Sequence, residues 1–237
     1  MSQPKPIRTY AIAALIGLGG GLIGALVAPA LPIPHPAFDE AVQKAILAHP
    51  DVLPAAVEKL KNDDTAKQVA QVGPQAQKAF PGAVLGNPKG AHVLVEFMDF
   101  ACGYCKASEA DVAKLIAADP QLKVVIRELP ILSPESVDAA KMGLAAARQG
   151  KYAAYHRAMF ASGHPSADTI TAAARTAGLD LAAAQKAIAD PALQAEIEGN
   201  LGMARALGIN GTPSWIAGGK LLSGALGYDG LAKAMAG

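Results

Sequence analysis

The sequence predicts an α/β domain that carries a helical insertion, and three observations support this. An apolar run near residue 91 is followed by a helical pattern and then by a second apolar run, the order of a parallel strand, helix, strand unit. An alanine-rich segment from about 134 to 207 has helical periodicity throughout. After it, two short apolar segments are joined by Gly218-Gly219, which favours a β-hairpin.

An apolar segment lies near the start of the chain. Lys5 and Arg8 precede an uncharged stretch at 10–31, which is long enough to cross the hydrocarbon core of a bilayer. Basic residues before such a stretch predict that everything after it is exported. Small residues near its end suit a signal peptidase, so residues 1–31 are expected to be either a signal peptide or a membrane anchor.

Residues 32–80 are expected to separate this segment from the main domain. Prolines at 32, 34 and 36 hold the backbone extended, which predicts a semi-rigid stalk. Residues 63–80 are polar and alanine-rich, and are expected to form a linker or a poorly specified helix.

Between the stalk and this linker, the pattern predicts two short helices. Apolar residues recur at helical spacing over 38–48 and again over 52–62. Each helix is too short to be stable alone, so its apolar face must be covered by the main domain or by another copy of the chain. A homo-oligomer formed through residues 37–62 is therefore one expectation.

The main domain is expected to occupy residues 81–237, with the helical insert at about 134–207. Short β-branched runs predict its strands, and 3.6-residue periodicity predicts its helices. The predicted order is a strand at 83–85, a strand at 91–100, a helix at 105–118, a strand at 122–128, helices at 135–149, 151–161, 167–177, 181–189 and 192–207, a hairpin at 214–223 and a closing helix at 227–235.

The charge balance argues against nucleic-acid binding. The chain has 21 Lys and Arg residues and 20 Asp and Glu residues, and only two of the basic ones precede residue 31, so the exported part is nearly neutral. It has no basic tract or basic-aromatic patch. We therefore expect no nucleic-acid partner.

Cys102 and Cys105 are the only cysteines, and they stand three positions apart where a predicted strand gives way to a helix. The free N–H groups and the positive dipole end of the helix favour the thiolate of Cys102. This pattern indicates a redox-active dithiol, in which Cys102 is the nucleophile and Cys105 the resolving thiol. An exported protein with one such pair fits an oxidising compartment.

Three other roles for the pair agree less well with the sequence. A zinc site needs two more ligands, and the five histidines show no metal-ligand spacing. Covalent haem needs a histidine directly after Cys105, where Lys106 stands. A purely structural disulfide would close too short a loop to constrain much of the unfolded chain. We expect neither a metal nor any cofactor beyond the dithiol.

Several residues near the dithiol have two possible roles. Glu96 stands in the apolar strand, and it either receives the proton that Cys105 must lose or points to water. Asp99 is expected to accept a loop hydrogen bond near the helix start. Tyr104 is expected to offer surface to a partner chain. His92, His156 and His164 show no evident partner and are expected to be structural.

Thr212-Pro213 stands directly before the predicted hairpin. A proline that opens a strand after a loop is a place where a cis peptide bond occurs. Such a bond would present the Thr212 backbone to an extended peptide, with Pro213 beside the sulfurs. An ordinary turn proline is the alternative.

The segment from Glu96 to Cys105, the helical insert and Gly211-Thr212-Pro213 together resemble the DsbA-like family of thioredoxin-fold thiol-disulfide oxidoreductases. The resemblance covers roughly 82–237 and is greatest to exported bacterial members of the ScsC and Com1 kind, some of which oligomerise through an extra N-terminal region. It implies a thioredoxin-like fold with a helical insertion. In this chain, residues 37–62 take the place of the extra region.

The resemblance also implies roles for individual residues. Cys102 becomes the exposed nucleophile and Cys105 the buried resolving thiol, and the two form the redox-active disulfide. Pro213 becomes the cis-proline with Thr212 before it, and Glu96 takes the place of the family's buried acidic residue. The chain departs from the strong oxidant of the family in the dipeptide Gly103-Tyr104, which replaces Pro-His and removes one source of thiolate stabilisation.

We therefore expect a periplasmic enzyme of Gram-negative type that exchanges disulfides with exported cysteine-containing proteins and is reset by a membrane redox partner. The client would be bound by Thr212, Pro213, Gly103 and Tyr104. An isomerase or reductase is favoured over a dithiol oxidase, because threonine before the proline is commoner in family members that isomerise or reduce. A copper-handling protein or chaperone that uses the dithiol as a soft-metal site is the alternative from another class.

Overall fold

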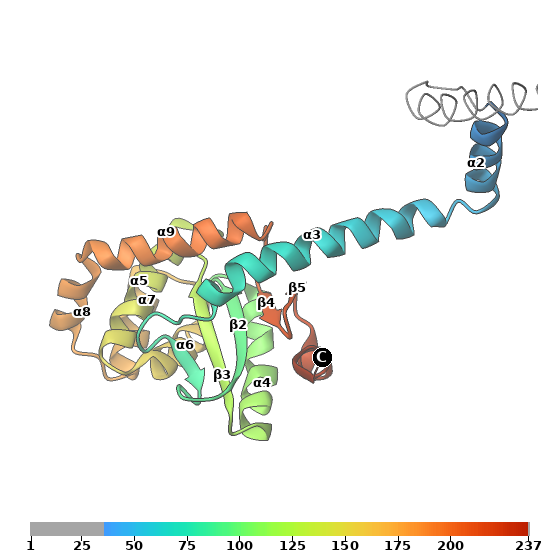
Figure 1. The fold of residues 1–237 in the computed structure, drawn as a ribbon. Helices are drawn as coiled ribbons and strands as arrows, with labels where there is room; N and C mark the ends of the chain where they lie inside the picture. Colours follow the sequence, from blue (N-terminus) through green and yellow to red (C-terminus); the bar gives the residue numbers. More distant parts are fainter. Residues whose placement is uncertain (1–35, 237) are drawn as a thin grey trace, which may run out of the picture. The chain divides into compact units, whose positions relative to one another are not determined.

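The computed structural model describes residues 36–236, with side chains from residue 39 onward (Figure 1). The apolar segment at 10–31 and most of the predicted stalk lie outside the described residues. Between residues 36 and 236, no helix is both long enough and apolar enough to span a membrane. The chain divides into two compact units at Val57 and Glu58, which we describe separately.

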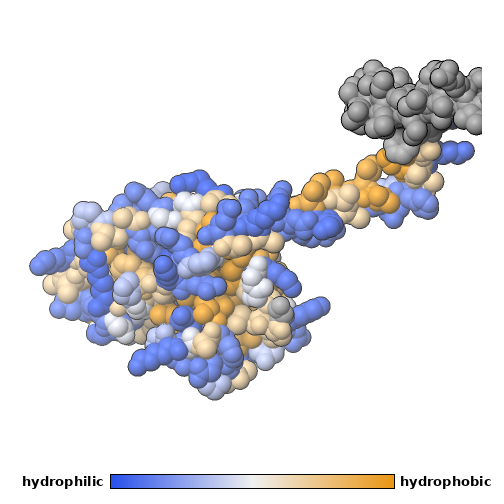
Figure 2. Space-filling model, in the orientation of Figure 1, coloured by the Kyte–Doolittle hydropathy of each residue, from blue (hydrophilic) through white to orange (hydrophobic). Residues whose placement is uncertain are grey.

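The first unit contains α2 (Pro36–Ala48) and the start of α3 (Val52–Ala76), so both predicted short helices are present. Large apolar side chains of the described residues of this unit are exposed: Val42, Leu47, Val52, Leu53 and Val57 are between 41% and 72% exposed. Figure 2 shows this apolar surface on α2 and on the N-terminal part of α3.

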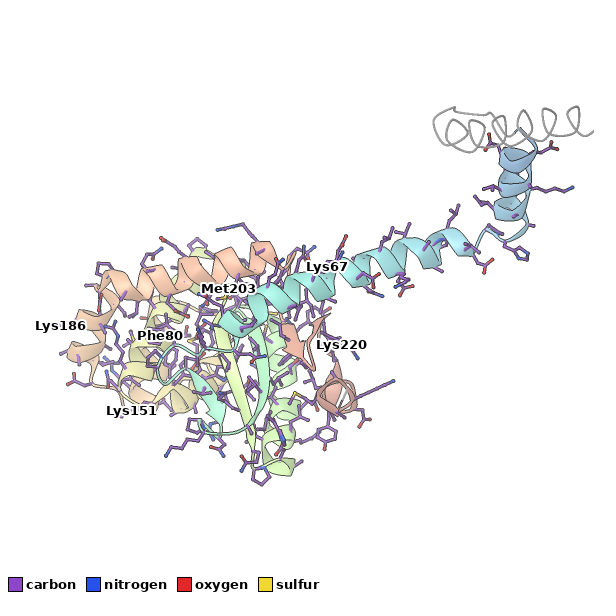
Figure 3. The ribbon with its side chains drawn as sticks, in the orientation of Figure 1. Lys67, Phe80, Lys151, Lys186, Met203 and Lys220 are labelled. Atoms are coloured by element: carbon purple, nitrogen blue, oxygen red, sulfur yellow. The ribbon has the colours of Figure 1, made fainter. Side chains whose placement is uncertain are left out.

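The second half of α3 belongs to the main unit, and of the two alternatives for 63–80, a linker or a poorly specified helix, the helix is present as far as Ala76. The helix continues without interruption to Ala76, with Pro74 inside its last turn. Val69 and Ala76 are buried in a cluster that also contains Met203 of α9 (Pro191–Ala206), which lies against this part of α3 (Figure 3). Packing against the domain therefore stabilises a sequence whose own helical pattern is weak.

A five-stranded sheet forms the centre of the main unit, in the order β1-β3-β2-β4-β5. The strands are β1 (Val84–Gly86), β2 (His92–Met98), β3 (Leu122–Glu128), β4 (Ser214–Ala217) and β5 (Lys220–Ser223). β2 and β3 are parallel and are joined by α4 (Gly103–Ala118), as predicted, while the other neighbours are antiparallel. Gly218 and Gly219 have positive φ in the turn between β4 and β5.

The two faces of β2 pack against different elements, because successive side chains alternate across a sheet. Leu94 and Met98 join the larger core cluster, with residues of α4 and of α10 (Gly227–Ala236). Val95 and Phe97 join the second cluster, with α3 and α9. The even positions of this strand therefore face α4, and the odd positions face α3.

The helical insert lies between β3 and β4 in sequence, as the alanine-rich segment predicted (Figure 1). Its helices are α5 (Pro134–Arg148), α6 (Tyr152–Ala161), α7 (Ala167–Thr176), α8 (Leu181–Ile188) and α9. The insert contacts the loop that carries the cysteines: the ring of Phe100 lies 5.1 Å from that of Phe160 and 5.6 Å from that of Tyr155, both in α6.

Candidate active site

The two cysteines stand where β2 ends and α4 begins. Cys102 is the N-cap of α4, and its Sγ accepts a hydrogen bond from the backbone N–H of Cys105 at 3.3 Å. Both sulfurs are free thiols. Cys102 is 6% exposed and Cys105 1%, so the expected order of exposure holds but the nucleophile is far less exposed than the resemblance implied.

The dipeptide between the cysteines is open to solvent. Gly103 and Tyr104 are both exposed, and Tyr104 is 70% exposed. A Cβ atom added at Gly103 would meet no atom within 4 Å, so no close backbone approach requires glycine there. The surface beside Cys102 is thus available to a partner chain.

The loop before β4 completes the site from the other side. The Thr212–Pro213 peptide bond is cis, as the resemblance implied. The Cys102 thiol donates to the backbone oxygen of Thr212 across a distance of 3.2 Å. Positions 110 residues apart in the sequence are therefore in direct contact at the reactive sulfur.

Glu96 is buried, which excludes the alternative in which it points to water. It is 2% exposed and lies on the same face of β2 as Leu94 and Met98, the face that packs against α4. Its cross-strand neighbours are the apolar residues Ile126 and Trp215. Its Oε2 atom has no hydrogen-bond partner among the described residues.

Burial raises the pKa of Glu96 well above its usual range, and the charges of Glu109, Cys102 and Glu128 raise it further. Burial also raises the pKa of the Cys105 thiol, and the nearby Glu96 carboxylate adds to this effect. Ionised Glu96 therefore disfavours the thiolate of Cys105.

Further buried polar groups, which the sequence analysis did not find, lie on this face. Tyr152 Oη donates to Glu128 Oε1 at 2.6 Å, and burial raises the pKa of the Glu128 carboxyl. The side chain of His156 is 2% exposed, and its Nδ1 lies 3.3 Å from Glu109 Oε2. His156 thus has a partner, although none was evident from the sequence. Of these residues, only Glu128 could have been inferred from the sequence. It is two residues after Ile126 in the neighbouring strand, so alternation places both on the same face of the sheet.

Asp99 does more than the expected loop hydrogen bond. Its Oδ1 accepts from the backbone N–H of Ala101 at 2.8 Å. Its Oδ2 accepts from the backbone N–H groups of Ile131 and Leu132 at 2.8 and 2.9 Å, and these two residues are absent from the sequence-based site. Asp99 therefore joins the cysteine loop to the loop between β3 and α5.

The possible metal ligands are dispersed in the described part of the chain. No group of three or more His, Cys, Asp or Glu side chains there is placed so that it could hold a metal ion.

A parallel strand, helix, strand unit with a dithiol at the helix start and a cis-proline loop against the first sulfur defines the class of thioredoxin-fold thiol-disulfide oxidoreductases. Residues 93–236 match the model of the DSBA-like thioredoxin domain family. The chain belongs to this family, as the resemblance in sequence indicated.

Solved structures agree with this assignment. A thioredoxin-like oxidoreductase from Silicibacter pomeroyi is 39% identical, with a TM-score of 0.62, and covers 65% of this chain and 89% of its own. The thiol-disulfide exchange protein α-DsbA2 from Wolbachia pipientis is 28% identical, with a TM-score of 0.69, and the match covers 75% of this chain and 97% of that protein. A linker-deletion mutant of Proteus mirabilis ScsC shares the fold at 23% identity, with a TM-score of 0.71, and the match covers 87% of this chain and 96% of that protein.

Two curated proteins match at the level of sequence. The Na⁺/H⁺ antiporter NhaA of Herminiimonas arsenicoxydans is 32% identical over 149 residues, which are 60% of this chain and 23% of that protein. NhaA 3 of Salinispora tropica is 29% identical over 154 residues, 63% of this chain and 24% of that protein. The chain thus spans less than a quarter of the length of these relatives.

Proposed function

We propose that this protein exchanges disulfides with exported, cysteine-containing client proteins. The contact between Cys102 Sγ and the Thr212 carbonyl carries the proposal, because it puts the nucleophilic sulfur beside backbone that an extended client can pair with. Membership of the DSBA-like family and the likeness to a thiol-disulfide exchange protein support the same chemistry.

The exchange runs through a mixed disulfide. The Cys102 thiolate attacks one sulfur of a client disulfide, a new sulfur-sulfur bond forms, and the other client sulfur leaves as a thiolate. In the reductase direction, the Cys105 thiolate then attacks the Cys102 sulfur, the client leaves with two reduced sulfurs, and the Cys102–Cys105 disulfide remains. In the isomerase direction, a client thiolate attacks the mixed disulfide instead and returns Cys102 as a thiolate.

Glu96 is the proposed proton acceptor for Cys105. The Cys105 thiol must lose its proton before it can attack, and burial disfavours its thiolate. Glu96 is close enough to influence that thiol, and its own buried carboxylate binds a proton readily. Gly103, Tyr104, Thr212 and Pro213 are the proposed client-binding residues around the sulfurs.

Isomerase or reductase action is the proposed direction. Gly103-Tyr104 brings no cationic side chain beside Cys102, and Thr212 precedes the cis-proline. The exposed apolar residues of α2 and α3 favour a homo-oligomer through residues 37–62, which suits an isomerase. A dithiol oxidase, recharged by a membrane oxidant, is the alternative.

We place the enzyme in the periplasm, with residues 10–31 as either a cleaved signal or an anchor in the inner membrane. The uncharged stretch after Lys5 and Arg8 supports export. A periplasmic thioredoxin-like protein from Salmonella enterica, 27% identical with a TM-score of 0.62, supports the same compartment. A membrane redox partner would reset the dithiol.

The deciding experiment gives residues 32–237 a scrambled, multi-disulfide test protein in a mildly reducing glutathione buffer. Recovery of the test protein's activity is expected for an isomerase. Rapid oxidation of a reduced test protein without recovery of the scrambled one would establish the oxidase instead.

The variant C105S distinguishes the proposed disulfide exchange from the alternative of a soft-metal site. It is expected to accumulate mixed disulfides with exported proteins, because the resolving thiol is gone. Failure to trap any, together with a copper ion that chelator removes from the purified wild type, would favour the soft-metal site.

A further inference from the structure

A surface cavity lies where α4, α6 and the end of β1 meet. Its volume is about 290 Å³, and its lining includes Glu109 and Ala113 of α4 and His156 and Arg157 of α6. Ala113 and Arg157 are exposed, so the cavity opens to solvent. In its lining, Nδ1 of the buried His156 ring lies 3.3 Å from Oε2 of Glu109, whose side chain is 26% exposed. A carboxyl that solvent can reach is therefore held against a buried imidazole.

Glu96 has no direct contact with water through which it could lose a proton. It is 2% exposed, and its neighbours on the adjacent strands are Ile126 and Trp215. Burial raises the pKa of this carboxyl, so molecules in which Glu96 holds a proton must release it before Glu96 can accept another from Cys105. A second carboxylate between Glu96 and solvent would speed this release.

Glu109 occupies such a place. It stands one helical turn after Cys105, so the two side chains share a face of α4. Three residues further on, Val112 lines the cavity and also joins the core cluster of Met98, on the Glu96 side of β2. Of the charges that raise the pKa of Glu96, that of Glu109 has the largest effect, ahead of Cys102 and Glu128. The two carboxyl groups are thus neighbours, one buried and one within reach of solvent.

His156 is fixed in turn by aromatic side chains. The rings of Phe100, Tyr152 and Phe160 lie between 5.0 and 5.7 Å from its ring. Its Nε2 atom is buried and has no hydrogen-bond partner among the described residues. The partner of each ring nitrogen sets the tautomer, so we assign the proton of the neutral ring to Nδ1, facing the Glu109 carboxylate.

We propose that Glu109 passes protons between Glu96 and solvent, and that His156 is the residue that positions Glu109 for this transfer. The proposal rests on the proposed disulfide exchange and adds two residues to it. The O–H bond of protonated Glu96 breaks, its proton passes to the Glu109 carboxylate, and Glu109 gives it to a water or buffer molecule in the cavity. Glu96 is then a carboxylate that can accept the S–H proton of Cys105. No electrons move in these steps.

The test is rescue by a small base in the full chain. E109Q is expected to slow decay of the mixed disulfide with glutathione about tenfold near neutral pH in dilute buffer, measured by rapid quench. Imidazole, which can enter the cavity and carry a proton, should restore about half of the lost rate or more. Pyrazole has the same size but binds no proton near neutral pH, and it should restore none.

D111N is the matched control for E109Q. Asp111 stands on the same helix with its side chain 25% exposed, and it pairs with Lys114 at the surface. Its substitution should leave the rate unchanged and insensitive to imidazole.

A purely electrostatic role of Glu109 gives a different result. Removal of its charge would lower the pKa of Glu96, so the pH profile of the step would move to lower pH and imidazole would have no effect. That outcome overturns the proposal. The other titratable or cationic groups that face the pair, which are Glu128, Tyr152 and Arg157, are present in both E109Q and wild type.

Two substitutions of His156 test its positioning role. H156N keeps an N–H donor near the place of Nδ1, and its rate should stay within about twofold of wild type. H156L fills a similar volume without a donor and should slow the step about fivefold. Equal rates in the two variants would show that the ring serves packing alone.

Failure of the proton transfer can be distinguished from failure of the proposed function. If wild type forms no mixed disulfide with glutathione, the proposed exchange fails, and this inference fails with it. If wild type reacts and E109Q behaves as D111N does, only the proposed role of Glu109 is overturned.

Discussion

Glu96 and Cys105 are two buried acids, and burial disfavours the ionised form of both. Burial raises the pKa of each, and Glu96 adds to the effect on Cys105. In solution a thiol and a carboxyl differ by about four pKa units, so the carboxylate would be a poor base for the thiol. The raised pKa makes the Glu96 carboxylate a stronger base than a carboxylate in water, while burial raises the pKa of the Cys105 thiol as well.

We expect E96Q to slow the resolving step about tenfold or more at neutral pH, because glutamine cannot accept the Cys105 proton. Rapid-quench measurement of the mixed disulfide with glutathione between pH 6 and 9 follows this step directly. D119N is the control, since Asp119 pairs with His92 at the opposite end of β2. Equal decay of the mixed disulfide in E96Q and D119N would remove Glu96 from the mechanism.

The same burial predicts how stability depends on pH. Glu96 binds its proton more tightly in the folded chain than in the unfolded chain, where the pKa is about 4.3. Between the two pKa values the folded state holds more protons, so the free energy of unfolding falls as pH rises. E96Q should make this slope less negative, by up to about 1.4 kcal/mol per pH unit.

Urea denaturation of wild type and E96Q across pH 4 to 9 measures the two slopes. Glu128, whose pKa is also raised, remains in both proteins and should leave a residual slope in E96Q. Identical slopes would mean that Glu96 has the same pKa in the folded and the unfolded protein.

The sequence could identify the residues that touch the reacting sulfurs, because the spacing of Cys102 and Cys105 and the Thr212-Pro213 pair are local patterns. It left the orientation of Glu96 open, since alternation along a strand does not say which face is buried. Tyr152 and His156 were missed because their partners, Glu128 and Glu109, come from other elements, and no local pattern encodes such pairs.

At the scale of elements, α3 is anchored to the sheet by one buried arginine. Arg127 of β3 is 3% exposed and donates to the backbone oxygens of Ala76, Gln75 and Lys78 at the end of the helix. It also pairs with Glu196 Oε1 of α9 at 2.9 Å. The guanidinium therefore gives a partner to the carbonyls of Ala76 and Lys78 and a second partner to that of Gln75, which also accepts from the Lys78 N–H.

We expect R127M to lower the free energy of unfolding by about 3 kcal/mol, because the carbonyls of Ala76 and Lys78 and the partly buried Glu196 carboxylate would lose the guanidinium as a partner. R148M is the control: Arg148 pairs with Asp190 at the surface, where the loss should stay below about 1 kcal/mol. Denaturant midpoints with equal m-values give the comparison. Similar losses in both variants would show that Arg127 does not anchor α3.

The extent of α3 could not be predicted from the sequence, because the contacts that fix its end come from a distant element. Residues 63–76 bury little beyond Val69 and Ala76, so their periodicity is weak. What fixes the helix end lies about 50 residues away, in Arg127. By contrast, β2, β3 and the insert helices have strong periodic patterns of their own and were predicted to within a few residues.

At the scale of the whole molecule, apolar side chains on the described residues of the N-terminal unit are exposed. Leu47 and Leu53 are 72% and 51% exposed. Surfaces of this kind on neighbouring helices mark sites of association. The proposed homo-oligomer through residues 37–62 would bury them.

We expect the wild type to sediment as an oligomer and L47S/L53S to sediment as a monomer, since the substitution removes apolar area from the shared surface without touching the catalytic unit. The unfolding midpoint of the catalytic unit is the control and should not change. A wild-type mass equal to that of one chain, or an unchanged mass in the variant, would contradict the proposed oligomer.

Position along β2 decides which property of the protein a substitution can reach. Its even positions face α4 and include Glu96, the proposed proton acceptor, and its odd positions face α3. Along these seven residues, substitutions at even positions would affect the proposed redox chemistry, and substitutions at odd positions would affect the packing of α3. Either property can be altered during evolution or engineering while the other is left intact.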